Sequence, residues 1–204
     1  RMLLGTGCAI SGTGFLVSAD IIRKNGGWKH HLLTEDIEFS IEMAIEGEKI
    51  GYCGSAVIYD EQPTRWKQSW NQRLRWSKGF YQVFAGYGRR LAAGALRPGN
   101  FACFDMLMTI APALLVTLSG LAFNGGLYLY GLTGQTRLMR AILYHTSGAI
   151  GASLLNTYLL LFFVGLLTTV TEWKQIHCGA VKKVLYLFTF PIFIFSYIPI
   201  AVTA

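Results

Sequence analysis

The sequence has 204 residues, of which 52% are hydrophobic and 14% are charged, and its formal net charge is +7. The charges are unevenly placed, because residues 106–136, 141–171 and 184–204 contain none. Since roughly 20 apolar residues suffice to cross a bilayer as a helix, this pattern argues against a single soluble domain, the usual expectation for this length.

The positive charge is concentrated in one part of the chain. Residues 1–64 carry nine acidic and five basic residues, a net charge of −4, whereas residues 65–97 carry eight basic residues and no acidic one. This basic belt at 65–97 lies just before the first uncharged stretch, where it fits a membrane surface. We therefore do not predict a nucleic-acid partner from the net charge.

Two Gly-Thr-Gly triplets, at residues 5–7 and 12–14, open the chain. The second precedes Phe15–Val17, which we predict to be a short strand, and residues 19–24 are predicted to form a short helix that ends near Asn25. The glycines serve either tight turns or close approach of the backbone to a ligand. They match neither the dinucleotide-binding fingerprint nor a phosphate-binding loop.

A helix is predicted to begin at Thr34, a good N-cap residue, and to end at Gly47. Its apolar residues recur with helical spacing on one face. Residues 48–63 are predicted to form two short strands around Gly54 and Ser55, stopped by Pro63.

Glu35 and Asp36 fall in the first turn of this helix, and two interpretations remain open. Acidic side chains are favoured at the positive end of a helix for electrostatic reasons alone. Alternatively, one of them is a general base, a carboxylate that takes a proton from a hydroxyl as that hydroxyl attacks. The helix N-terminus also tends to keep a carboxylate ionised.

Residues 64–86 have an amphipathic pattern that includes the sequence WNQRLRW at 70–76. On a helix, Gln72, Arg75 and Trp76 share a face. They belong either to an interfacial helix with tryptophans and arginines at lipid headgroups or to a ligand site. In a ligand site, arginine holds a diphosphate, tryptophan covers a sugar ring and glutamine hydrogen-bonds to oxygen-rich ligands.

Three membrane segments are predicted, at about 106–131, 143–170 and 184–204. Their small and polar residues indicate either helix–helix contacts or the lining of a polar path; these residues are Pro112, Gly120, Asn124, Gly125, Gly126, His145, Ser147, Gly148, Gly151, Ser153, Asn156, Pro191 and Pro199. By the positive-inside rule, residues 1–100 and the loop 172–183 are cytoplasmic, and the loop near 132–141 faces outward.

The four cysteines, Cys8, Cys53, Cys103 and Cys178, show no CxxC spacing. We expect neither a disulfide nor a metal site from them. The chain opens at Arg1 without a methionine and without a secretory signal, so we expect it to be the later part of a longer protein.

The order Thr34-Glu35-Asp36, then Gln72-x-x-Arg75-Trp76, then membrane helices resembles the processive family-2 glycosyltransferases, which include cellulose, hyaluronan and poly-N-acetylglucosamine synthases. The segment SGTGFLVSADIIRKNGGW, which starts at Ser11, also looks like the part of that family that helps form the acceptor end of the pocket. The resemblance covers essentially the whole chain and is carried by the two motifs together.

The resemblance implies a fold and a domain order. The fold is α/β with membrane α-helices. Residues 1–64 are the C-terminal part of a cytoplasmic GT-A-type nucleotide-sugar transferase domain, 65–100 an interfacial amphipathic segment, and 101–204 a transmembrane region of about three helices.

The resemblance also implies an activity and roles for particular residues. It implies inverting transfer of a sugar from a UDP-sugar to a glycan hydroxyl, in the plasma membrane. Asp36 matches the general base, and Glu35 and Thr34 frame it. Gly12 and Thr13 lie at the acceptor end, Gln72, Arg75 and Trp76 lie over the active site, Arg75 would bind the diphosphate and Trp76 the acceptor sugar.

The family uses Mg²⁺ or Mn²⁺ at an acidic motif that is absent here, since no DxD sequence occurs in the chain. We therefore assign no metal ligand within the chain and expect the ligands upstream, in the complete enzyme. N-acetylglucosamine is the expected sugar, because TEWKQIHCGAVKKVLYLF at 171–188 is similar to bacterial poly-N-acetylglucosamine enzymes. The alternatives are a non-processive transferase that acts on a lipid-linked acceptor and a non-catalytic membrane subunit.

Overall fold

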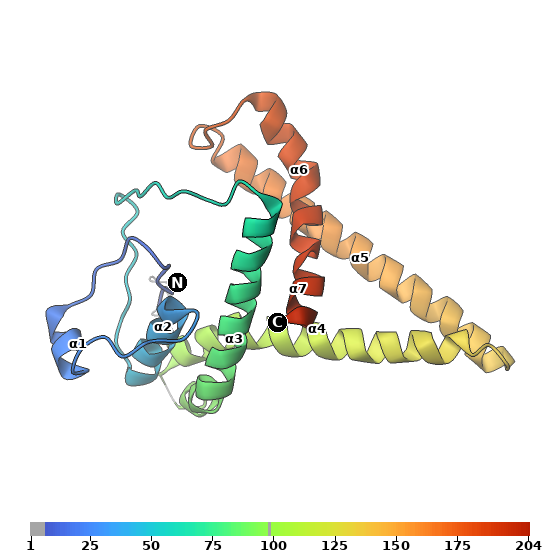
Figure 1. The fold of residues 1–204 in the computed structure, drawn as a ribbon, viewed down its shortest axis with the longest axis horizontal. Helices are drawn as coiled ribbons and strands as arrows, with labels where there is room; N and C mark the ends of the chain where they lie inside the picture. Colours follow the sequence, from blue (N-terminus) through green and yellow to red (C-terminus); the bar gives the residue numbers. More distant parts are fainter. Residues whose placement is uncertain (1–6, 98) are drawn as a thin grey trace. The chain divides into compact units, whose positions relative to one another are not determined.

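The computed structural model describes residues 7–97 and 99–204, and at 112–118 it describes the backbone only. Within these residues the chain forms seven helices and no strand (Figure 1). The helices are α1 (Ala19–Lys24), α2 (Glu35–Glu46), α3 (Trp66–Ala95), α4 (Phe101–Leu132), α5 (Arg137–Thr171), α6 (Ala180–Phe195) and α7 (Tyr197–Thr203).

The chain divides into two compact units. The first comprises Arg1–Thr117 with Thr203–Ala204, and the second comprises Leu118–Val202. Gly5 and Thr6 of the first Gly-Thr-Gly triplet, and the side chain of Pro112, lie outside the described part of the chain.

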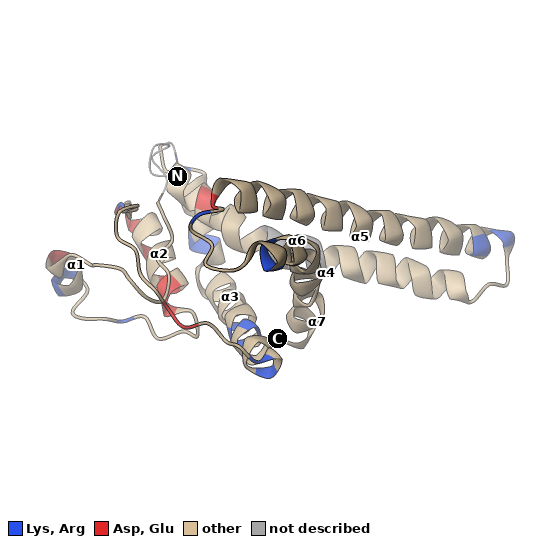
Figure 2. Ribbon diagram, turned by 90° about the horizontal axis from the view of Figure 1, so that it is seen from above, with Lys and Arg blue, Asp and Glu red and all other residues tan. Residues whose placement is uncertain are grey.

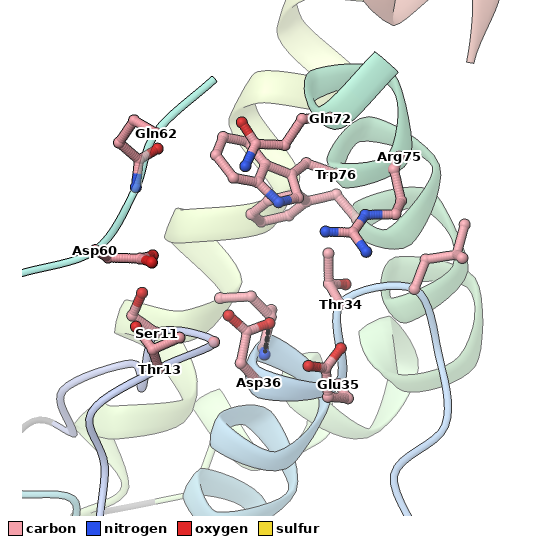
Figure 3. A pocket seen from close by; sticks show the side chains of 14 residues that line it. Ser11, Thr13, Thr34, Glu35, Asp36, Asp60, Gln62, Gln72, Arg75 and Trp76 are labelled. Atoms are coloured by element: carbon pink, nitrogen blue, oxygen red, sulfur yellow. Dashed lines mark hydrogen bonds between the residues drawn. The ribbon is translucent and has the colours of Figure 1, made fainter. Parts of the chain in front are cut away.

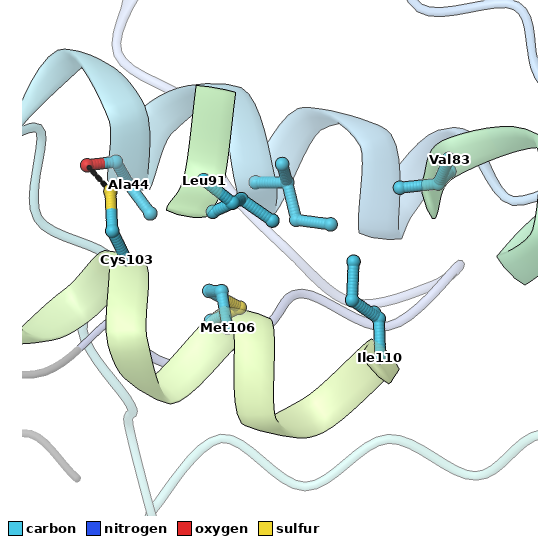
Figure 4. Close-up of a cluster of buried hydrophobic side chains, with 7 residues drawn as sticks. Ala44, Val83, Leu91, Cys103, Met106 and Ile110 are labelled. Carbon is cyan, nitrogen blue, oxygen red and sulfur yellow. Dashed lines mark hydrogen bonds between the residues drawn. The ribbon is translucent and has the colours of Figure 1, made fainter. Parts of the chain in front are cut away.

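The first unit is held together by one buried cluster in which three helices meet (Figure 4). α2 supplies Ile41 and Ala44, α3 supplies Val83 and Leu91, and α4 supplies Cys103, Met106 and Ile110. Full burial of one such aliphatic side chain contributes about 1.5–3 kcal/mol. The cluster therefore fixes α2 and α3 against each other, and with them the residues at their ends.

Glycines let the backbones of this unit approach closely. A Cβ added at Gly94 of α3 would lie 2.6 Å from Cys103 Sγ. The Cys103 thiol in turn donates to the carbonyl oxygen of Ala44 over 3.4 Å, and its burial raises its pKa. Cys103 thus packs between α2 and α3 as part of the buried cluster.

The two short helices confirm the start and stop signals in the sequence. α1 spans the predicted residues and ends at Asn25, and α2 ends at Gly47, whose φ of 79° lies in the left-handed region that glycine favours. Thr34 occupies the N-cap position of α2, as predicted, although its side chain makes no capping hydrogen bond.

The predicted strands at 15–17 and within 48–63 are absent from the described residues. A strand is stable only when a neighbour takes up its backbone hydrogen bonds. The backbone N–H of Cys8 donates to the carbonyl oxygen of Ile50 over 3.2 Å, but the structure assigns no strand to either region. Residues 51–62 are exposed throughout. The described chain is therefore mostly helical, and the α/β and GT-A assignments remain predictions.

In the second unit, α5 packs along α6. The rings of Phe162 and Phe188 lie 5.2 Å apart, and the Tyr158 hydroxyl donates to the carbonyl oxygen of Phe188 over 3.2 Å. Gly165 faces Phe190, whose ring lies 3.4 Å from a Cβ placed there. At the start of α6, the Lys183 ammonium lies 4.4 Å from the centre of the Trp173 ring.

Two described helical stretches are long and apolar enough to cross a membrane, Arg137–Thr171 and Ala180–Thr203. They include the predicted segments at 143–170 and 184–204. The segment predicted at 106–131 falls within α4, of which Phe101–Ala111 is a shorter apolar stretch, and three spans remain a prediction. Figure 2 shows the basic residues of α3 and the nearly uncharged lengths of α4, α5 and α6.

Candidate active site

A cavity of about 410 Å³ lies in the first unit, between the N-terminus of α2 and the first half of α3 (Figure 3). All eight site residues predicted from the sequence line it, namely Gly12, Thr13, Thr34, Glu35, Asp36, Gln72, Arg75 and Trp76. Residues far apart in the sequence thus meet at one place. Their catalytic and binding roles remain predictions.

Asp36 presents its carboxylate to this cavity from the first turn of α2. Oδ1 accepts a hydrogen bond from the backbone N–H of Ile37 over 2.8 Å. Oδ2 faces the glycine loop, since a Cβ added at Gly12 would lie 3.8 Å from it. One oxygen is therefore held by the protein, and the other is directed to the place where a ligand would lie.

Ser40 holds the glycine loop next to Asp36. Its hydroxyl donates to the carbonyl oxygen of Asp36 over 2.7 Å and accepts from the backbone N–H of Ile10 over 2.9 Å. Ser40 is completely buried, one turn of α2 beyond Asp36. This bridge positions Gly12 and Thr13 as a wall of the cavity.

Thr34 lies where α3 passes closest to α2. It is 5% exposed, and its Oγ1 has no hydrogen-bond partner among the residues the structure describes. A Cβ added at Gly79 of α3 would lie 2.5 Å from Thr34 Cγ2 and 2.6 Å from Oγ1. Only glycine at position 79 allows α3 to approach so closely.

α3 supplies the opposite wall. Gln72, Arg75 and Trp76 share one helical face, and Figure 3 shows the Arg75 guanidinium pointing from α3 toward the N-terminus of α2. The Arg75 side chain is exposed, and Trp76 is 37% exposed. A cation, an aromatic surface and an amide are therefore presented to the same space as the Asp36 carboxylate.

Six further residues line the cavity that the sequence did not reveal, Ser11, Leu33, Ile37, Asp60, Gln62 and Phe80. Phe80 could have been found, because it follows Trp76 by one helical turn. Ser11 and Leu33 adjoin residues that were predicted. Asp60 and Gln62 carry no such signal, because they reach the cavity from the extended segment before α3 (Figure 3).

The cavity combines groups that suit the transfer of a sugar. A carboxylate can accept a proton from a hydroxyl, a guanidinium can bind phosphate oxygens, and tryptophan offers an apolar surface to a sugar ring. No described residues form a group of three or more His, Cys, Asp or Glu side chains that could hold a metal ion. The described residues therefore do not by themselves fit a divalent metal.

Comparison with known proteins places the chain in a family. The sequence profile of the family described as "Glycosyl transferase family group 2" matches residues 1–204. The chain is 39% identical over 70 residues to "Probable glycosyltransferase YdaM" of Bacillus subtilis (strain 168), a stretch that covers 34% of this chain and 17% of that protein.

Two further relatives have more specific names. One is "Beta-monoglucosyldiacylglycerol synthase" of Synechocystis sp. (strain ATCC 27184 / PCC 6803 / Kazusa), 28% identical over 89 residues, which are 44% of this chain and 19% of that protein. The other is "Poly-beta-1,6-N-acetyl-D-glucosamine synthase" of Staphylococcus aureus (strain COL), 30% identical over 83 residues, which are 41% of this chain and 20% of that protein.

These matched stretches span 17% to 20% of the lengths of the three relatives. No solved structure matches the chain. Because the family profile matches the sequence from end to end, the chain belongs to the glycosyltransferases of family group 2.

Proposed function

We propose that this chain carries the base and the acceptor side of an inverting glycosyltransferase that extends a polysaccharide from a UDP-sugar. One observation carries the proposal: Asp36 of α2 and Arg75 and Trp76 of α3 line the same cavity. Family membership supports the reaction class.

The proposed reaction is a single displacement. The acceptor hydroxyl gives its proton to the Asp36 carboxylate, and its oxygen attacks the anomeric carbon of the donor sugar. The bond between that carbon and the diphosphate oxygen breaks, so UDP leaves and the anomeric configuration inverts. Arg75 stabilises the negative charge that develops on the diphosphate, and Trp76 holds the acceptor ring so that the hydroxyl meets Asp36.

The lining of the cavity supports a sugar as the acceptor. Ser11, Thr13, Asp60, Gln62 and Gln72 offer hydroxyl, carboxylate and amide groups, which suit the many hydroxyls of a glycan. The S. aureus relative's name contains poly-N-acetylglucosamine, which supports N-acetylglucosamine as the transferred sugar and a processive mode of synthesis.

We also propose that the complete enzyme uses Mg²⁺ or Mn²⁺, held by residues outside those described here. A divalent cation would neutralise charge on the leaving diphosphate. The basic belt at 65–97 and the apolar helices support a multi-pass protein of the plasma membrane with residues 1–100 in the cytoplasm.

A lipid acceptor is the second candidate. The observation in its favour is the Synechocystis relative, whose name specifies a monoglucosyldiacylglycerol as the product.

The test is UDP release by membranes that contain the full-length protein, across a panel of UDP-sugars, with added Mg²⁺ or Mn²⁺. We expect release with one sugar and its loss in Asp36→Asn, a change that preserves shape but removes the base. Turnover retained by Asp36→Asn would remove Asp36 as the base. Addition of diacylglycerol separates the candidates, since only a lipid-acceptor enzyme would depend on it.

A further inference from the structure

Glu38 is a buried carboxylate that the proposed reaction does not use. It is 7% exposed and lies on α2, two residues after Asp36. Its Oε2 accepts hydrogen bonds from the backbone N–H groups of His31 and Leu32, both at 3.1 Å. A buried carboxylate is costly unless it is fully hydrogen-bonded, and these bonds tie it to the loop that leads into Thr34.

The other oxygen of Glu38 reaches α3. The Tyr87 hydroxyl donates to Oε1 over 2.9 Å. Burial, followed by the hydrogen bond to Glu38, raises the pKa of Tyr87 to about 12. Tyr87 therefore keeps its proton near neutral pH and can act as the donor to Glu38.

Glu38 does not line the cavity itself, but it connects the loop before α2 to α3, the two parts of the chain that form the cavity walls. The loop at 31–33 sets the position of Thr34–Asp36, and α3 carries Arg75 and Trp76. Tyr87 lies twelve residues beyond Arg75, or about 18 Å along the helix at 1.5 Å per residue. Because Gly79 already touches Thr34, a small shift of α3 at Tyr87 would move Arg75 relative to Asp36.

We propose that Glu38 and Tyr87 are positioning residues, which hold the Asp36 loop and the Arg75 helix in the geometry needed for transfer. This inference rests on the proposed function for the roles of Asp36 and Arg75, but the contacts stand without it. A carboxylate suits the place because it offers two acceptor oxygens to donors on opposite sides, two backbone N–H groups and one phenol.

The sharpest variant is Tyr87→Phe. The Tyr87 ring packs on the buried cluster and against the Arg90 guanidinium at 5.7 Å, and phenylalanine keeps the ring while removing only the hydroxyl. The matched control is Tyr52→Phe, which removes the same group from a side chain that is 73% exposed and does not line the cavity.

A graded pair at position 38 tests the same link. Glu38→Gln can still accept from the backbone with its oxygen while its NH₂ donates to the Tyr87 hydroxyl, so it should retain most activity. Glu38→Leu can make neither bond and leaves two backbone N–H groups and a phenol without their acceptor. Recovery by the glutamine variant would show that hydrogen bonding, and not side-chain volume, is what position 38 supplies.

Two measurements on the full-length protein in membranes decide the matter. The first is hydrogen–deuterium exchange of peptides that cover residues 31–36, which needs no substrate. The second is UDP release from a UDP-sugar panel, analysed as kcat per folded molecule and KM for the donor. We expect Tyr87→Phe to exchange faster at 31–36 and to lose about tenfold in kcat with little change in KM, the loss that one hydrogen bond to a charged group predicts.

The outcomes are distinguishable. Unchanged exchange in Tyr87→Phe, or an unchanged kcat per folded molecule with only a lower melting temperature, would overturn the positioning role. A wild-type protein that releases UDP from no sugar would count against the proposed function, and the exchange measurement would then still decide whether Glu38 and Tyr87 hold the loop.

Discussion

Gly79 of α3 packs directly against Thr34, the residue before α2. A Cβ there would lie 2.5 to 2.9 Å from three atoms of the buried Thr34 side chain, closer than real Cβ contacts allow. We expect Gly79→Ala to push Thr34 or α3 aside and so to displace Arg75 and Trp76 from Asp36. The predicted result is at least a tenfold loss of UDP release per folded molecule, since small misplacements cost catalysis heavily.

Gly86→Ala is the matched control, because it lies in the same helix and a Cβ placed there has no described atom within 4 Å apart from its own helical turn. Alanine is favoured over glycine inside a helix by about 0.5–1 kcal/mol, so this variant should keep its activity and unfold at an equal or higher temperature. Equal UDP release per folded molecule by the two alanine variants would show that the contact with Thr34 does not affect activity.

Arg75 is the cation that α3 directs into the cavity (Figure 3). If it binds the diphosphate, Arg75→Ala should weaken binding of UDP to the full-length protein by about tenfold or more, as expected for a charged hydrogen bond. Arg89→Ala is the control, because Arg89 is exposed on the same helix and outside the cavity. Isothermal titration with UDP measures the affinity of both variants. Equal affinities would favour the alternative role of Arg75, a contact with lipid headgroups.

At the scale of elements, α2 organises the first unit by gathering the segments before it. Glu42 binds Lys29 at 3.2 Å and His30 Nε2 at 2.6 Å, and the Trp28 ring stacks on Phe39 with centroids 5.2 Å apart. One face of the helix thus anchors residues 28–30. The apolar residues Ile41 and Ala44 of the same helix belong to the buried cluster instead.

The anchoring by Glu42 should depend on pH in a defined direction. Burial of Glu42 raises its pKa, but the hydrogen bonds from His30 and Lys29, together with the charges of these two residues, lower it by more, so the pKa lies below its ordinary value of 4.5. A lowered folded-state pKa contributes stability above the ordinary value, which is lost as the pH falls through the folded value. We expect the melting temperature to be steady down to about pH 4.5, near the ordinary pKa of a glutamate, and to fall below it.

Glu42→Gln provides the comparison for this titration. It should melt lower than wild type at neutral pH and lose less on acidification, so that the two curves approach each other in acid. Thermal unfolding in detergent across a pH series would show this. Parallel curves for the two proteins would mean that Glu42 does not titrate in this way.

The helix α2 was predictable from local signals, and the family resemblance named eight residues that the structure brings to one cavity, whereas the predicted strands are absent from the described residues. α2 could be read from Thr34, its apolar spacing and Gly47, since each acts within a few residues. The strands predicted at 15–17 and 48–63 depend on partners that no local pattern specifies. Asp60 and Gln62 were missed for the same reason, because an extended segment without a period gives no indication of which side chains meet the cavity.

Glu38 shows a further limit of sequence reading. It lies in the first turn of α2 with Glu35 and Asp36, and nothing in the sequence distinguished it as a candidate site residue. Its contacts with His31, Leu32 and Tyr87 require the packed arrangement of α2 and α3. A residue that joins two walls of a cavity becomes visible only when both walls are in place.

At the scale of the whole molecule, charge and apolar length follow one another along the chain. Residues 1–64 carry the acidic residues of the candidate site, which are Glu35, Asp36 and Asp60. The basic belt at 65–97 follows on α3, and the candidate spans follow the belt (Figure 2). Basic residues concentrate on the cytoplasmic side of membrane proteins. The order therefore predicts that the site and the basic belt share the cytoplasmic side.

This topology can be tested with thiols that differ only in place. Cys178 lies in the loop 172–183, which should be cytoplasmic, and Gln135→Cys would place a thiol in the loop near 132–141, which should face outward. Two full-length variants are compared: one keeps Cys178 as the single cysteine of this chain, and the other lacks all four cysteines and carries Gln135→Cys. A membrane-impermeant maleimide should label position 135 in intact cells. It should label Cys178 only after permeabilisation, because the basic residues Lys174, Lys182 and Lys183 hold that loop inside. Labelling of Cys178 alone in intact cells would invert the orientation, and it would place the Asp36 cavity on the side of the membrane where nucleotide-sugars are not supplied.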